Sequence, residues 1–106
     1  MIIKENLKRA ILRSELAYEH YKSDKLYFQA LRIFSANQEV YKNLVEYSQT
    51  CNEEELQDVF NYIFHLEDWF NQFENEMLHV ELNEVFVFER LEKGIAYPNE
   101  FIKKLK

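Results

Sequence analysis

Apolar residues recur at steps of three and four along most of this chain, which is the pattern of amphipathic helices. Between residues 3 and 21 these positions are held by Ile3, Leu7, Ala10, Ser14, Ala17 and Tyr21. A second helix is predicted over residues 26–48, where two apolar stripes run side by side. A helix with two apolar stripes is expected to contact two neighbouring helices.

The third predicted helix has the most regular pattern. Its seam is formed by Leu56, Val59, Ile63, Leu66, Phe70, Phe73, Met77 and Val80. Asn52 before it, with Glu55 three residues later, is typical of a helix N-cap. Further apolar side chains lie off this seam, so the third helix is predicted to be central in the bundle, or to form the interface of a homodimer.

Beyond Val80 the pattern breaks at residues 81–84, and a shorter fourth helix is predicted to end near Lys93. Gly94 is a natural helix stop, and Pro98 can begin a short last helix that reaches Leu105. The chain of 106 residues is therefore predicted to be one domain over residues 1–106. Its fold class is all-α, a small antiparallel bundle of about four helices plus a short C-terminal helix.

Composition supports this fold and limits the function. One Gly and one Pro are too few for the turns of a β-sandwich, and one Gly cannot build a glycine-rich phosphate loop. The single Cys51 can form no internal disulfide. The first residues become charged within four positions, and no apolar run approaches membrane-spanning length. We therefore expect a cytoplasmic protein that does not enter a membrane.

Charge is segregated along the chain, and this segregation is the feature of the sequence that bears most on function. Residues 43–89 contain twelve acidic and no basic residues, a charge of −12, whereas residues 1–42 and 90–106 each carry +3. Part of this acidic tract begins the third helix, where the helix dipole favours carboxylates. Six carboxylates farther along have no Lys or Arg four residues away and so predict a basic counterpart, from the same protein or from a partner: Glu67, Asp68, Glu74, Glu76, Glu81 and Glu84.

These six residues are the predicted contacts with a partner protein. The predicted function is a non-enzymatic, acidic interaction module that engages a basic protein surface, such as that of a nucleic-acid-handling protein, as an inhibitor or adaptor. The acidic small-bundle character resembles that of phage-encoded inhibitors of host defence. Direct binding of nucleic acid is not expected for a chain with a net charge of −6.

Two other functions remain open. Arg13 and His20 are seven residues apart and share a helix face, so Arg13 could hold a phosphate while His20 transfers a proton. Their spacing resembles the Arg-x(4–6)-His signature of HEPN-type ribonucleases, and this resemblance implies a metal-independent ribonuclease, commonly dimeric.

Glu76 and His79 have the Glu-x-x-His spacing of di-iron bundles. This spacing makes a di-iron-type metal-binding bundle the third possible function. Because both residues fall on the flank and outer face of the third helix, no metal or other cofactor is predicted.

Overall fold

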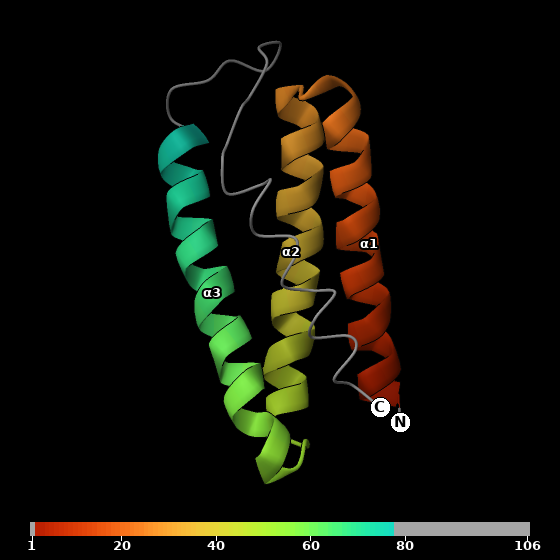
Figure 1. Cartoon of the computed structure of the whole chain (residues 1–106), viewed down its shortest axis with the longest axis vertical. Helices are drawn as coiled ribbons and strands as arrows, with labels where there is room; N and C mark the ends of the chain where they lie inside the picture. Colours follow the sequence, from red (N-terminus) through yellow and green to blue (C-terminus); the bar gives the residue numbers. More distant parts are fainter. Residues whose placement is uncertain (1, 78–106) are drawn as a thin grey trace.

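The computed structural model describes residues 2–77, which form three α-helices and no strand. Helix α1 spans Ile2–Asp24, α2 spans Tyr27–Ser48 and α3 spans Glu53–Met77. Consecutive helices run antiparallel and are joined by short turns (Figure 1). The all-α fold is confirmed. The fourth and the C-terminal helix predicted from the sequence lie outside the described residues.

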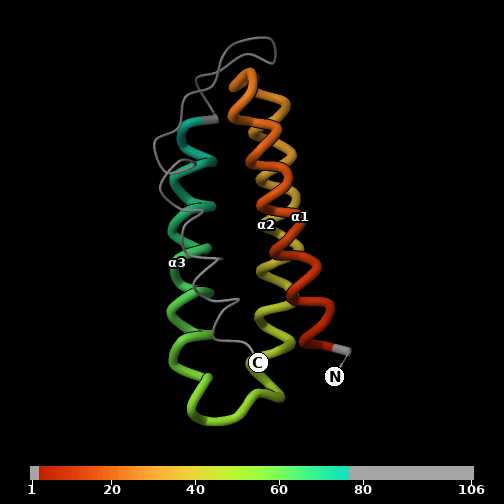
Figure 2. The backbone as a smooth tube through the Cα atoms, turned by 45° about the vertical axis from the view of Figure 1, so that its right-hand side comes forward, coloured from red at the N-terminus to blue at the C-terminus, as the bar shows by residue number. Residues whose placement is uncertain are grey.

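Helix α2 is the central helix of this described part. It lies between α1 and α3 in Figure 1 and contacts both of them. In the view of Figure 2 α1 overlaps α2, and α3 lies to one side. The predicted central position of the third helix refers to a bundle that includes residues beyond 77, so it stays a prediction. On α3 two of the off-seam aromatic side chains, Tyr62 and Trp69, are buried, whereas Phe60 and Phe64 are 40% and 61% exposed.

The core consists of two clusters of buried side chains. The first joins all three helices through Leu7, Ala10, Ile11, Val40, Leu44, Tyr47, Val59, Tyr62, Ile63 and Leu66. The second lies nearer the α1–α2 turn and is mostly aromatic, with Tyr21, Tyr27, Ala30, Ile33, Trp69 and Phe73. Many of the aromatic side chains of the described residues thus lie in the core. Burying side chains of this size contributes about 1.5–3 kcal/mol each.

The turns follow from local backbone chemistry. Lys25 has a φ of 54° and ends α1, its N–H bonded to the Tyr21 carbonyl at 2.7 Å. The side chain of Asp24 accepts a hydrogen bond from the Leu26 N–H at 3.2 Å and closes the turn. At the next turn Asn52 accepts the Glu55 N–H at 3.1 Å, which confirms the predicted N-cap.

The Glu55 carboxylate itself binds the Tyr47 hydroxyl and ties the end of α2 to the first turn of α3. Burial, together with the hydrogen bond to Glu55, raises the pKa of Tyr47 above its usual value.

None of the three helices in the described range is long and apolar enough to cross a membrane.

A buried polar contact separates the two clusters. The hydroxyl of Ser14 on α1 donates a hydrogen bond of 2.5 Å to Oδ1 of Asn37 on α2, and the two residues are 1% and 7% exposed. A buried polar group that loses its partner costs about 1–3 kcal/mol. The pair therefore fixes the register of α1 against α2, because a shifted register would leave both groups unpaired.

We predict that Ser14→Ala lowers the free energy of unfolding by about 2 kcal/mol, since the buried Asn37 carbonyl loses its donor. The double variant Ser14→Ala/Asn37→Ala should cost at least about 1 kcal/mol less than the sum of the single variants. Urea unfolding of the four proteins measures both effects. Ser23→Ala, an exposed change of the same type, is the control. Additive single changes would contradict the coupling.

Candidate functional site

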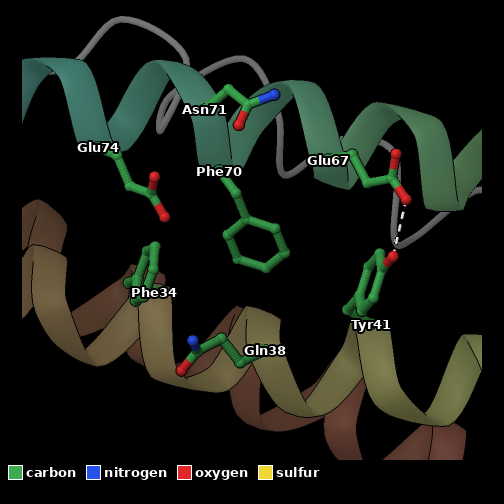
Figure 3. A pocket seen from close by; sticks show the side chains of 7 residues that line it. All are labelled: Phe34, Gln38, Tyr41, Glu67, Phe70, Asn71 and Glu74. Atoms are coloured by element: carbon green, nitrogen blue, oxygen red, sulfur yellow. Dashed lines mark hydrogen bonds between the residues drawn. The ribbon is translucent and has the colours of Figure 1, made fainter.

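An open groove of about 460 Å³ runs between α2 and α3 (Figure 3). Its floor is aromatic, because Phe70 points from α3 toward α2 and lies between Phe34 and Tyr41. The Phe70 ring meets Phe34 edge-on at a centroid distance of 5.3 Å and Tyr41 edge-on at 6.0 Å. These are favourable aromatic geometries, so the floor is formed before any ligand arrives.

The floor of this groove is continuous with the core. Phe34 stacks on the buried Phe73 at 5.1 Å and on Trp69 at 6.1 Å. Trp69 in turn stacks on Phe73 at 5.0 Å. The aromatic floor therefore cannot shift without disturbing the second core cluster.

Two of the predicted carboxylates form the acidic rim of this groove. Glu67 and Glu74 are both exposed and both line it, together with Gln38 and Asn71. The two glutamates are seven residues apart, so they lie within about 20° of one another around α3 and about 10 Å apart along it. Phe70 lies between them in the sequence and at the centre of the groove.

The hydroxyl of Tyr41 donates a hydrogen bond of 2.7 Å to Oε1 of Glu67. This hydrogen bond, then burial, then the negative charge of Glu67 raise the pKa of Tyr41 above its usual value. One oxygen of the Glu67 carboxylate is thus held by a neutral phenol. This hydrogen bond fixes the position of the Glu67 carboxylate at the rim.

Of the other predicted contacts, the two that the structure describes, Asp68 and Glu76, do not line this groove. Asp68 is exposed and lies about 100° around α3 from Glu67, where it accepts a hydrogen bond from Gln72 at 3.5 Å. Glu76 is exposed and about 180° from Glu67, on the opposite flank. Glu81 and Glu84 lie outside the described residues. The acidic tract is therefore not one continuous surface along α3.

A second open groove, of about 450 Å³, lies on the other flank of α2, against α1. It brings together Arg13 and His20, the pair predicted from their spacing on α1. It also contains Arg32 and Glu39 of α2, which were not predicted. The sequence does carry a signal for them, because Arg32 and Glu39 are seven residues apart, the same spacing as Arg13 and His20.

Metal ligands do not gather in the described part of the chain. Among residues 2–77, no three His, Cys, Asp or Glu side chains are close enough to hold a metal ion. Glu76 of the Glu-x-x-His spacing is exposed, and His79 lies outside the described residues.

The described residues thus define an antiparallel helical bundle with two polar grooves, one on each flank of its central helix. Comparison with known proteins gave no match among family models, curated proteins or solved structures.

We predict that Tyr41→Phe lowers the free energy of unfolding by about 0.5 kcal/mol at neutral pH, because Glu67 loses a partly exposed hydrogen bond. The pKa of Tyr41 is raised on folding, so its contribution is complete below about pH 10 and is lost as the pH rises through the folded-state value. The stability difference between wild type and variant should therefore shrink as the pH rises above about 10. Urea unfolding across this range measures it, and a constant difference would contradict the linkage.

Proposed function

We propose that this protein is a non-enzymatic interaction module that binds a basic segment of a partner protein in the groove between α2 and α3. The observation that carries the proposal is the pair of carboxylates, Glu67 and Glu74, on the rim of a preformed aromatic groove. Such a groove accepts one or two apolar side chains of a partner, while the rim selects positively charged neighbours.

The spacing of the groove residues describes what would fit. A helical partner that presents an apolar side chain to Phe70, and a Lys or Arg on each side of it, would satisfy both glutamates. Exposed ion pairs contribute only about 0.2–1 kcal/mol each, whereas burying one large apolar side chain contributes about 1.5–3 kcal/mol. The carboxylates therefore mainly set orientation and association rate, and the aromatic floor supplies most of the affinity.

A more specific version of this proposal names the class of partner protein. Surfaces that normally hold nucleic acid are rich in Lys and Arg, and an acidic protein can occupy them in place of phosphates. The net charge of −6 and the exposed carboxylates of α3 support an inhibitor or adaptor of such a protein. Assembly as a homodimer stays a prediction, to which the exposed Phe60 and Phe64 of α3 lend support.

We predict that Glu67→Gln/Glu74→Gln weakens binding of a basic helical peptide about tenfold at low salt, since two ion pairs are lost. The probe is a labelled amphipathic peptide with Lys at positions 1 and 8 and Leu at position 4, titrated by fluorescence anisotropy. Salt should weaken the wild-type complex more than the variant complex.

The matched control is Asp68→Asn/Glu76→Gln, which removes the same charge from other faces of α3. This control should change the affinity less than about twofold. Equal losses in the two double variants would assign the binding to the overall charge of the chain and contradict a site in the groove. A peptide with Glu in place of both Lys residues should bind the wild-type protein more weakly than the Lys peptide binds the Glu67→Gln/Glu74→Gln variant, because like charges then face each other.

A second candidate is the metal-independent ribonuclease that uses Arg13 and His20. It is favoured by one observation, namely that the two side chains line the same groove on α1. There Arg13 would hold a phosphate, and His20 would transfer a proton to or from the ribose hydroxyl.

For this candidate we predict that the purified protein cleaves single-stranded RNA in the presence of a chelator. His20→Ala should reduce the rate at least about 100-fold, because general acid–base catalysis contributes that much. The helical circular dichroism should stay unchanged, since His20 is exposed. Residual cleavage in the His20→Ala protein would identify a contaminating nuclease and reject the candidate.

A further inference from the structure

Most of the large apolar side chains that are exposed in the described part of the chain lie on the two outer helices. Leu12 and Leu16 of α1 are 56% and 61% exposed, and Phe60 and Phe64 of α3 are 40% and 61% exposed. The members of each pair are four residues apart, so each pair forms a short apolar stripe on one face of its helix. Because all four side chains are exposed, the two stripes do not cover each other within one molecule.

The apolar stripe of α1 is flanked by basic residues. Leu16 lies between Arg13 and His20, and these three exposed side chains form the basic face of α1. Among the described residues, neither Arg13 nor His20 has an ion-pair or hydrogen-bond partner. Glu39 of α2 lines the same groove but pairs with neither of them. The guanidinium group and the imidazole are therefore available to carboxylates of another molecule.

The acidic groove repeats the spacing of the basic face with the opposite charge. Glu67 and Glu74 are seven residues apart, as are the two basic residues of α1. In both cases the position three residues after the first charge is apolar, Phe70 on α3 and Leu16 on α1. Seven residues advance an α-helix by about 10 Å and return to within about 20° of the same direction. The basic face of α1 thus has the composition of the helical partner that fits the acidic groove.

Hydrogen bonds between the helices give the relative heights of the two surfaces. Ser14 of α1 pairs with Asn37 of α2, and Tyr41, one turn further along α2, pairs with Glu67 of α3. Because α2 runs antiparallel to both neighbours, Arg13 lies within about one helical turn, or about 5 Å, of the height of Glu67. A second copy in the same orientation therefore needs only a small shift along the bundle axis to bring its basic face level with the acidic groove.

The apolar stripes favour this parallel orientation. Leu12 precedes Leu16 by one turn on α1, and Phe64 precedes Phe70 by nearly two turns on α3. Both exposed stripes thus extend from the charged surfaces toward the N-terminal ends of their helices, and α1 and α3 run in the same direction (Figure 1). An antiparallel arrangement would extend them in opposite directions and leave both uncovered.

A symmetric contact between two acidic grooves is disfavoured by charge. It would place the carboxylates of Glu67 and Glu74 against like charges, and α3 carries eight carboxylates and no Lys or Arg. A contact between α1 of one copy and α3 of another brings opposite charges together instead. Charge complementarity therefore selects two different surfaces of the same chain.

We propose that this protein associates head to tail with further copies of itself, the basic face of α1 in one copy docking in the acidic groove of the next. Arg13 pairs with Glu67, His20 pairs with Glu74, and the leucine between the two basic residues contacts Phe70. Such a contact can add copies in a row unless it closes into a ring. It rests on the proposed docking role of the acidic groove, and by filling this groove it competes with a basic partner protein.

The experiment measures the mass of the full chain by sedimentation equilibrium at low ionic strength, up to about 1 mM because small interfaces bind weakly. We expect the mean mass to rise past that of a dimer with increasing concentration, and to fall when salt is added. Arg13→Gln/Leu16→Gln changes the basic face, and Glu67→Gln/Glu74→Gln changes the acidic rim. Each variant alone should associate at least about tenfold more weakly than the wild type.

Mixing these two double variants in equal amounts distinguishes a head-to-tail contact from a symmetric dimer. The first variant keeps an intact acidic groove, and the second keeps an intact basic face. The mixture should therefore form a one-to-one dimer with nearly the wild-type affinity and nothing larger. A symmetric dimer formed through the acidic groove would instead persist in the first variant alone.

The matched control is Phe28→Gln/Lys42→Gln. It removes one exposed apolar side chain and one positive charge from α2, at positions that line neither groove. Association should change less than about twofold. Thermal unfolding followed by circular dichroism establishes that all the variants are folded.

A charge exchange within one chain tests the parallel pairing. Arg13→Glu should weaken association more than Arg13→Gln/Leu16→Gln does, because like charges then face each other. Adding Glu67→Arg to Arg13→Glu should restore association, since each contact again joins opposite charges. Adding Glu74→Arg instead should not restore it.

Three results would overturn the proposal: a wild-type chain that stays monomeric over the whole range, a mixture of the two double variants that does not associate, and no rescue by Glu67→Arg. A monomeric chain that still binds the basic peptide in its acidic groove would reject self-association and leave the proposed function standing. A chain that associates as described but does not bind the peptide would reject the basic partner and leave self-association standing.

Discussion

Helix α2 has to bury two faces at once, because it lies between α1 and α3 in the described bundle (Figure 1). Its most deeply buried residues, Ile33, Val40 and Leu44, are wholly covered. The positions beside this buried strip form the flanks of the helix. On one flank Phe34, Gln38 and Tyr41 face α3, and on the other Arg32, Ala36 and Glu39 lie against α1. Both grooves are therefore consequences of how α2 is packed.

The two grooves have opposite electrostatic character and act separately. A helix with its side chains is about 10–12 Å across, whereas charges are screened over about 8 Å at physiological ionic strength. Glu67 and Glu74 on the α3 side thus have little influence on Arg13 and Arg32 on the α1 side. A protein with a net charge of −6 can in this way carry a locally basic surface between α1 and α2.

Much of the fold could be predicted from the sequence, because helices and their ends depend on local patterns. The periodicity of apolar residues predicts all three described helices, and the cap residue Asn52 predicts where α3 begins. The sequence could not show which helix is central. An apolar stripe indicates how much surface a helix buries, but it does not identify the element that covers this surface.

The candidate sites also depend on contacts between helices that the sequence alone does not reveal. Carboxylates that are neighbours in the sequence, such as Glu67 and Asp68, point to different faces of α3, because each residue turns the helix by about 100°. Spacing within one helix was enough to pair Arg13 with His20, whereas Glu67 and Glu74 were predicted only as two members of a set of six carboxylates. Residues contributed by another helix, such as Arg32 or Tyr41, become part of a site only through tertiary packing.

The acidic groove also separates the requirements of folding from those of recognition. Its floor belongs to the core, since Phe34 stacks on the wholly buried Phe73. A ligand thus meets a surface that is already ordered and pays little conformational entropy. Its rim, by contrast, consists of exposed side chains such as Glu74, whose replacement changes stability by less than about 0.5 kcal/mol. The rim can therefore be changed while the aromatic floor and the bundle stay intact.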